Sequence, residues 1–238
     1  MNCHQIIQEF QSMASEKYKQ NVIKLGIPED CSIGVSTEEV RKLAKKIGKS
    51  NQLANELWKT GYHEARLLAV LLFDKKTITL AEVKPLMKDV VSWDLCDHLC
   101  KNIIIKIDGY QVLIEEWVTS REQYLKRAAF TLMASAVIHE KNISNHTVNR
   151  YLELISEYSD DEREHVKKAV AWALKEIGKK DFNYNEKAIL LCNDLKESKN
   201  KTEVWIAKTA LKELENLVKV EGRGRLISAS SQMGKEKN

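Results

Sequence analysis

The chain has 238 residues, enough for one sizeable core or a row of repeats, and 43% of them are hydrophobic. It holds only two prolines and nine glycines and has no apolar run of membrane length, so we expect a globular protein without a membrane partner. The five cysteines are scattered, odd in number and not preceded by a signal peptide, which favours a reducing, cytoplasmic compartment over a disulfide framework.

The formal net charge of +4 is concentrated at the C-terminal end. Residues 218–238 hold five basic and two acidic side chains, which supply +3 and leave +1 for the rest of the chain. Bulk charge is therefore weak support for a nucleic-acid partner, and local clustering of cations matters more. Because this segment has no helical pattern, we predict a disordered basic tail over residues 218–238. A solvated tail is the favoured interpretation over a loose phosphate-binding arm.

Helical periodicity recurs from the first residues to about Leu217, and no segment sustains the alternation and turn pairs of strands. The class is therefore all-α. We expect residues 2–25 to form an N-terminal cap and Gly26–Gly34 to be the longest internal loop. S-x-x-E or S-x-x-Q sequences at Ser36, Ser120 and Ser159 predict capped helix starts.

A short pattern recurs at 65–69, 125–129, 166–170 and 206–210, and it aligns Arg127, Lys168 and Lys208 at spacings of 41 and 40 residues. A period near 40 with two helices per unit is typical of HEAT-like repeats. We predict one right-handed α-solenoid domain over residues 1–217, with about five or six helix pairs. The second helix of each pair would line the concave face of this solenoid.

One predicted helix begins at Ser92, which we predict as its N-cap. Its apolar side consists of Leu95, Cys96, Leu99 and Ile103. At about 100° per residue, Asp97 lies roughly 140° and Trp93 about 100° from that side. Trp93 and Asp97 are four residues apart and share a face.

Two later helices carry similar exceptions on the side away from the apolar stripe. In the segment 122–137, Arg127 lies roughly 170° from the stripe and is expected to point outward. In the segment 164–179, Trp172 lies roughly 140° from the stripe and points the same way as Lys168, Lys175 and Lys179. The solenoid would make these side chains and those near Ser92 neighbours across one groove.

Each of these residues also has an ordinary explanation. Asp97 has Lys101 four residues on and could simply form a surface ion pair. Arg127 could be a solvated arginine rather than a phosphate clamp, and Trp172 could be exposed by chance rather than for stacking. Asp97 could instead stabilise a developing cation or orient a water molecule.

Other candidates are weaker. We expect Trp58, Trp117 and Trp205 to pack between helices. Cys96 and Cys100 fall on or near the apolar side while His98 points elsewhere, so no tetrahedral set converges and we expect no metal. No Gly-rich phosphate loop or nucleotide-fold motif is evident, and we expect no cofactor.

Three stretches resemble the AlkD-type DNA alkylation repair glycosylases: Ser92–Asp97 with W-D-x-x-D, Leu125–Ala129 with K-R-A-A, and Val166–Lys175 with A-x-x-W-x-L. They occur in the family's order, within a likeness that runs from Gly34 to the region before the tail. The resemblance implies a HEAT-like solenoid that removes positively charged N3- or N7-alkylated purines from duplex DNA without a metal. It also implies that the base is not extruded into a pocket.

By position, the resemblance makes Asp97 the catalytic carboxylate and Trp93 and Trp172 the aromatics that cradle the deoxyribose of the lesion. Arg127 would hold the phosphate backbone, and Lys168, Lys175 and Lys179 are our further candidates for DNA contacts. The chain departs from the family at Ser92, where active members often have a second aromatic, and at Lys175, where they often have an arginine.

We therefore predict a monomeric, monofunctional glycosylase that acts on alkylated purines in duplex DNA. The alternative is a non-catalytic scaffold that binds DNA or another acidic partner through the same face. A protein-binding solenoid indifferent to nucleic acid is disfavoured, because it gives no reason for Asp97 to accompany the basic groups.

Overall fold

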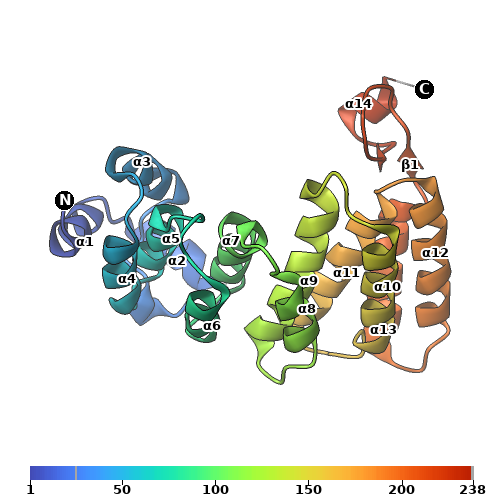
Figure 1. Ribbon diagram of the computed structural model, residues 1–238, viewed down its shortest axis with the longest axis horizontal. Helices are drawn as coiled ribbons and strands as arrows, with labels where there is room; N and C mark the ends of the chain where they lie inside the picture. Colours follow the sequence, from blue (N-terminus) through green and yellow to red (C-terminus); the bar gives the residue numbers. More distant parts are fainter. Residues whose placement is uncertain (25, 237–238) are drawn as a thin grey trace. The chain divides into compact units, whose positions relative to one another are not determined.

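The computed structural model describes residues 1–24 and 26–236, and it is helical almost throughout. The chain divides into two compact units, Met1–Tyr110 and Gln111–Asn238 (Figure 1), and a single domain over residues 1–217 stays a prediction. The all-α prediction is confirmed, since the strands that the structure assigns within those ranges form one two-residue pairing. Within the same ranges, no helix has both the length and the apolarity needed to cross a bilayer.

The first unit consists of short helices in sequence order. They are α1 (Cys3–Ser12), α2 (Glu16–Lys24), η1 (Glu29–Cys31), α3 (Thr37–Ile47), α4 (Asn51–Lys59), α5 (His63–Leu72), α6 (Leu80–Lys88), α7 (Trp93–Asn102) and η2 (Ile104–Lys106). The predicted N-terminal cap corresponds to α1 and α2, and its last residue, Leu25, lies outside the described residues. Helix α5 is central, because it packs against α3, α4 and α7.

A buried carboxylate fixes the corner between η1 and α3. Glu64 of α5 is almost fully buried and accepts hydrogen bonds from the Ser32 hydroxyl at 3.0 Å and from the backbone N–H groups of Ile33 and Gly34 at 2.9 and 2.7 Å. Gly34 has a φ of +96°, and a Cβ there would lie 2.8 Å from the Ser15 carbonyl oxygen. This loop therefore accepts only glycine at its corner, and Glu64 sets where α3 begins.

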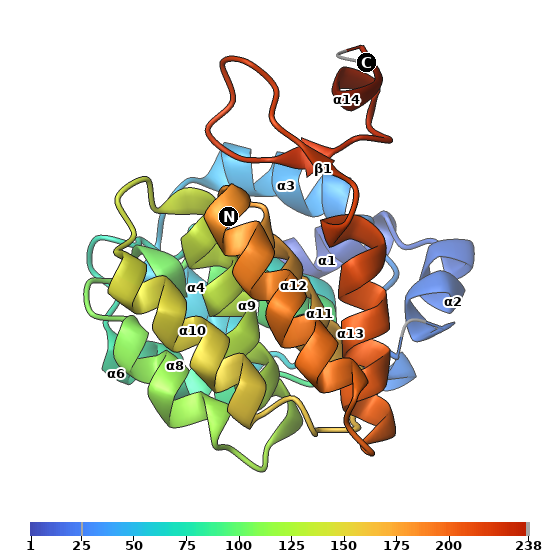
Figure 2. The same ribbon diagram turned by 90° about the vertical axis from the view of Figure 1, so that its right-hand side faces the viewer.

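The second unit consists of longer helices. They are α8 (Gln111–Val118), α9 (Gln123–His139), α10 (Asn145–Glu157), α11 (Glu164–Gly178), α12 (Phe182–Lys196) and α13 (Lys201–Leu214). Helix α11 packs against both α9 and α13, while α8, α10 and α12 lie beside them (Figure 2). The recurring pattern lies in α5, α9, α11 and α13, which are the second helices of the pairs α4–α5, α8–α9, α10–α11 and α12–α13.

One of the three predicted capping sequences acts as a cap. Ser36 accepts a hydrogen bond from the Glu39 N–H and begins α3. The predictions at Ser120 and Ser159 are wrong, because α9 and α11 begin further on. The Ser120 hydroxyl accepts from the Glu122 N–H, and the Ser159 hydroxyl donates to the Ser156 carbonyl oxygen. Such local bonds compete with capping, so the motif alone does not fix a helix start.

The tail differs from the disordered segment predicted over residues 218–238. Strand β1 (Leu217–Val218) pairs antiparallel with β2 (Ile227–Ser228), and α14 (Gln232–Lys235) follows. Leu226 is buried, and its N–H donates to the Lys179 carbonyl oxygen at 2.8 Å. These contacts join residues distant in sequence, so a search for helical periodicity could not reveal them. Residues 237 and 238 lie outside the described residues.

Candidate nucleic-acid interface

Helix α7 has the faces that its sequence predicts. Leu95, Cys96, Leu99 and Ile103 are all buried, which confirms the predicted apolar side. Ser92 is the N-cap residue, as expected, but its side chain makes no capping hydrogen bond. Trp93 is half-buried on the neighbouring face.

Asp97 lies at the edge of the core and lines a cavity. The residue is 9% exposed, and its Oδ2 lies 3.5 Å from Lys101 Nζ, so the ordinary i,i+4 ion pair is present. Asp97 also lines a hollow of about 360 Å³ within the first unit, together with Trp93. The ion pair and the cavity position therefore coexist, and the pair alone does not explain why the carboxylate is so little exposed.

Two further polar residues of α7, Asp94 and His98, line the same cavity. Asp94 Oδ2 lies 2.8 Å from Nε2 of the buried His63 on α5. Burial favours a higher pKa for Asp94, but the hydrogen bond and the charge of His63 act against it, and the pKa is lowered. Burial, reinforced by the positive charge of Arg41, lowers the pKa of His98 to about 4. The imidazole of His98 is therefore neutral at neutral pH.

Arg41 of α3 also lines this cavity and was not among the predicted site residues. It lies on an exposed turn of a helix with a strong amphipathic pattern, where arginine is unremarkable in sequence. Only its position beside α7, fixed through α5, distinguishes it.

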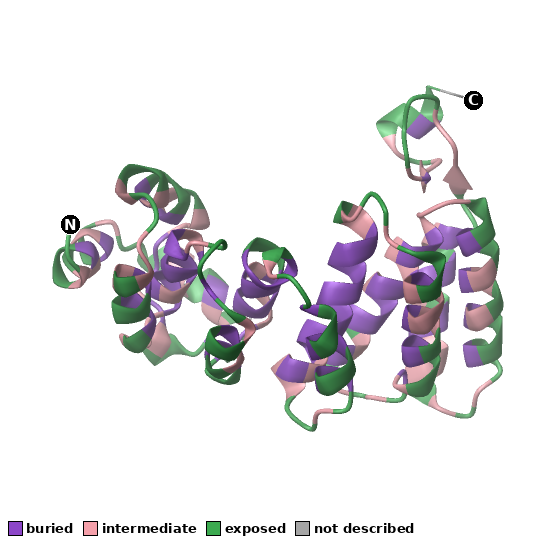
Figure 3. Ribbon diagram, in the orientation of Figure 1, coloured by how far each residue is buried: buried purple, intermediate pink, exposed green. Residues whose placement is uncertain are grey.

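Arg127 is not outward-facing, and that prediction is wrong. It is 6% exposed, and its Nη1 donates to the His165 carbonyl oxygen of α11 at 2.6 Å. The prediction took the angle between Arg127 and a single apolar stripe, whereas α9 is buried on nearly every side (Figure 3). A helix enclosed all round has no solvent-facing side to which an off-stripe residue could point.

Trp172 is half-buried on α11, and the lysines predicted around it are paired with carboxylates. Lys168 Nζ lies 2.8 Å from Glu164 Oε1, and Lys175 Nζ lies 3.4 Å from Glu213 Oε2. Hydrogen bonds from Lys167 and Lys168 lower the pKa of Glu164 to about 2. This face therefore carries less net positive charge than its lysines alone suggest.

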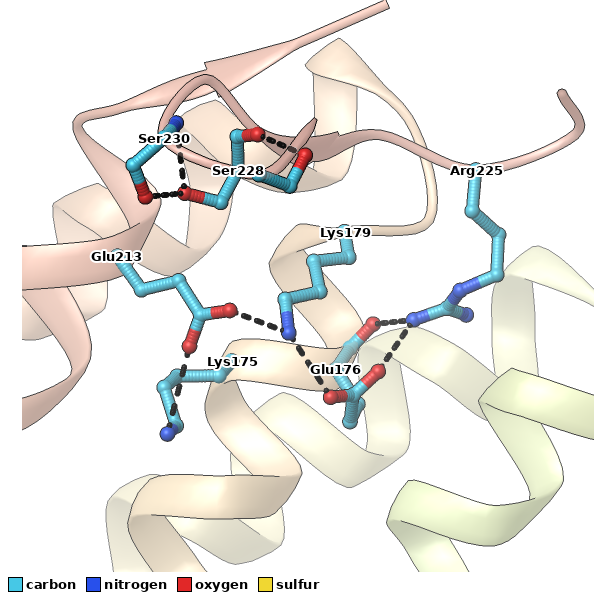
Figure 4. A network of polar contacts seen from close by, with 8 residues as sticks. Lys175, Glu176, Lys179, Glu213, Arg225, Ser228 and Ser230 are labelled. Atoms are coloured by element: carbon cyan, nitrogen blue, oxygen red, sulfur yellow. Dashed lines mark hydrogen bonds and ion pairs between the residues drawn. The ribbon is translucent and has the colours of Figure 1, made fainter. Parts of the chain in front are cut away.

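Lys179 belongs to a larger network that reaches the tail (Figure 4). Its Nζ contacts Glu213 Oε1 at 2.5 Å and Glu176 Oε1 at 3.1 Å. Burial works against the charged amine, but Glu213 and Glu176 prevail and raise the pKa of Lys179. From the other side, Arg225 donates to the Glu176 carboxylate at 2.8 Å and to the Val137 carbonyl oxygen at 2.6 Å.

The structure thus brings the predicted site residues into two groups. Trp93 and Asp97 line one cavity of the first unit. Arg127, on α9 of the second unit, contacts α11, which carries Trp172 and the lysines. Convergence of both groups in one groove stays a prediction. Trp58 and Trp117 are buried as expected, while Trp205 is half-buried with Lys167 Nζ 5.0 Å from its ring centroid.

No cluster of three or more His, Cys, Asp or Glu side chains within residues 1–24 and 26–236 has the arrangement of a metal site. Cys96 and Cys100 are both buried in the apolar side of α7.

Comparison with known proteins places the chain in a family. Residues 6–214 match the family described as DNA alkylation repair enzyme. No curated protein matches the sequence. Among solved structures, a protein from a family related to the HEAT-like repeat DNA glycosylases, with affinity for branched DNA structures, aligns with a TM-score of 0.72 and 21% identity. That alignment covers 100% of this chain and 94% of the other.

A designed armadillo repeat protein in complex with a peptide aligns with a TM-score of 0.36 and 16% identity, over 83% of this chain and 99% of the other. The fold is therefore that of the HEAT-like repeat proteins, on the strength of the first alignment. Because the family match spans most of the helical residues, the chain belongs to the DNA alkylation repair enzyme family.

Proposed function

We propose that this protein is a DNA glycosylase that hydrolyses the N-glycosidic bond of positively charged N3- or N7-alkylated purines in duplex DNA. The observation that carries the proposal is the joint position of Trp93 and Asp97 in one cavity, with the carboxylate largely removed from solvent. A carboxylate in such surroundings interacts with a nearby positive charge more strongly than one in bulk water.

The chemistry fits these groups. An alkylated purine is cationic and already a good leaving group, so catalysis chiefly requires stabilisation of the oxocarbenium-like sugar as the bond stretches. The Asp97 carboxylate supplies negative charge for that sugar, and the electron-rich faces of Trp93 and Trp172 supply further stabilisation. Asp97 also orients the water molecule that attacks the sugar. No metal or other cofactor takes part in this scheme.

DNA binding is shared among cations in this proposal. Lys168, Lys175 and Lys179 exchange their carboxylate partners for phosphates, which costs little where the pairs are partly exposed. Arg127 is better placed to support α11, through the His165 carbonyl, than to reach DNA by itself. Its contribution to phosphate binding would therefore be indirect.

The test is the release of 7-methylguanine or 3-methyladenine from alkylated duplex DNA. The Asp97→Asn variant should release base at least about a hundredfold more slowly, because removing a group that stabilises transition-state charge costs on that order. The matched control is Asp108→Asn, which removes the same charge at an exposed position outside this cavity. Release by the wild-type protein no faster than the spontaneous rate would refute the enzymatic proposal.

A second candidate is a non-catalytic protein that binds DNA, including branched DNA. It is favoured by the carboxylates that pair with Lys168 and Lys175 on α11 and with Lys179 at its C-cap. The affinity for branched DNA of the structurally similar protein also favours it. This candidate predicts salt-dependent binding to DNA with no base release, and binding that Asp97→Asn leaves unchanged.

A further inference from the structure

Two exposed cations line the cavity that holds Trp93 and Asp97: Lys101, which pairs with Asp97, and Arg41. The lining also includes Thr37 from α3 and His98 from α7. Both carboxylates of the lining have partners: Asp94 contacts His63, and Asp97 contacts Lys101. The positive charge of Arg41 nevertheless reaches into the cavity, since it helps to lower the pKa of His98 after the larger effect of burial.

Arg41 differs from most other arginines of this chain in its bonding. Five arginines donate to backbone carbonyls or carboxylates: Arg66, Arg127, Arg150, Arg163 and Arg225. Among the described residues, Arg41 forms no hydrogen bond and no ion pair. An exposed guanidinium with five free N–H donors, at the edge of a cavity, is suited to a planar or tetrahedral oxyanion.

The start of α3 adds to the positive potential at this position. Ser36 caps the helix, and Thr37 in its first turn lines the cavity, so the N-terminal end of an 11-residue helix faces this region. The two acidic residues of that turn, Glu38 and Glu39, are both paired with Lys42. Because Glu64 holds the preceding loop, the placement of Arg41 relative to α7 is fixed by buried bonds rather than by surface contacts.

We propose that Arg41 binds one backbone phosphate of DNA, next to the nucleotide that Trp93 and Asp97 face. The proposal rests on the proposed function for the identity of the ligand, and it names a contact on the first unit that the sequence did not predict. The guanidinium fork donates two parallel hydrogen bonds to the two free oxygens of one phosphodiester. Such a contact carries no sequence information and fixes the position of the sugar relative to Asp97.

The first experiment measures the affinity of the full chain for an unmodified duplex at a series of salt concentrations. Removing one phosphate contact should reduce the slope of log K against log salt by about 0.9. Arg41→Ala and Arg41→Gln should both show that reduction, to the same extent on alkylated and unmodified DNA. The matched control is Lys46→Ala, which removes one exposed positive charge from the same helix outside the cavity. A slope unchanged by Arg41→Ala, or reduced equally by Lys46→Ala, would overturn the proposal.

The second experiment locates the phosphate. Single uncharged methylphosphonate linkages, placed one at a time along an alkylated duplex, should weaken wild-type binding at several positions. At one linkage close to the lesion, the methylphosphonate should weaken binding of the wild-type protein but not of Arg41→Ala. The variant already lacks the contact with that phosphate. Additive losses at every linkage would contradict the proposal. Base release by the wild-type protein is a separate readout, so a failure of the glycosylase proposal leaves these two results interpretable.

Discussion

The two groups of predicted site residues are built in different ways. Around α7, the buried His63 holds Asp94, and the buried Glu64 holds the loop that leads to α3, while Asp97 is little exposed although its partner Lys101 is exposed. Around α11, the lysines pair with carboxylates that remain partly exposed, and one of these carboxylates, Glu213, pairs with both Lys175 and Lys179. The surroundings of the first group are therefore held by buried bonds, while the second group can change partners at low cost.

Because of this difference, the two groups suit different parts of the proposed function. Positioning a carboxylate against a reacting sugar requires a fixed geometry, which buried hydrogen bonds supply. Binding a flexible, uniformly charged backbone requires cations that can move to meet it. If the comparison is right, substitutions in the first group should lower stability, and substitutions in the second should change DNA affinity and leave stability almost unchanged.

The largest effect is expected at Glu64. Glu64→Gln replaces a carboxylate that accepts several hydrogen bonds by an amide whose NH2 group faces the same donors. We expect the free energy of unfolding to fall by about 3 kcal/mol, because buried donors lose a charged acceptor. Urea denaturation at neutral pH measures this.

Glu56→Gln is the control for Glu64, since Glu56 is exposed on α4 and its carboxylate accepts a hydrogen bond from the neighbouring Gln52 side chain. Equal stability of Glu64→Gln and wild type would mean that the first unit is not held by buried bonds, and the contrast with α11 would collapse.

The second effect depends on pH and involves His98. Its pKa in the folded protein is about 4, below the ordinary value of 6.5, chiefly because it is buried. As the pH falls from 6.5 towards 4, the unfolded chain takes up a proton that the folded chain does not, so stability falls and then levels off. At about 1.4 kcal/mol per pKa unit, the loss is roughly 3 kcal/mol at the lower end.

His98→Gln should remove that part of the pH dependence, although it also lowers stability at neutral pH by disturbing the contact with Asn102. His4→Gln removes an exposed imidazole and should leave the pH dependence as it is. The measurement is the free energy of unfolding between pH 7 and pH 4.5. An identical pH dependence in wild type and His98→Gln would show that this imidazole is not held neutral by burial.

The sequence predicts well which face of a helix is buried, and poorly which residues of other helices its polar side chains contact. The apolar side of α7, the repeat in α5, α9, α11 and α13, and the family were all accessible from spacing and motif. The buried position of Arg127 was not accessible in this way, because a periodicity argument assumes one buried face and α9 has several. The ion pairs of Lys179 were equally hidden, since Glu213 lies on another helix.

Arg41 shows the same limit, here for a residue that the sequence did not single out. Nothing in its own segment distinguishes it from the lysines beside it, and its importance arises only because Glu64, thirty residues from Gly34, fixes the start of α3. Sequence spacing reports neighbours on one helix. A site assembled from α3, α5 and α7 requires the packing of those helices, which no single periodic pattern contains.

The smallest effect is expected in the second group, at Glu213. Its carboxylate pairs with Lys175 and Lys179, and although burial favours a higher pKa, those lysines lower the pKa of Glu213. Glu213→Gln should release Lys175 and leave Lys179 with Glu176 as its carboxylate partner. The affinity for unmodified duplex should then rise several-fold at low salt, with the gain shrinking as salt rises. Glu215→Gln, two residues away and exposed, removes the same charge without these ion pairs. A gain specific to Glu213→Gln, with an unfolding midpoint close to wild type, is the result expected of cations held by exchangeable partners. An equal gain in both variants would reflect net charge alone, and a large loss of stability would mean that α11 is as rigidly built as α7.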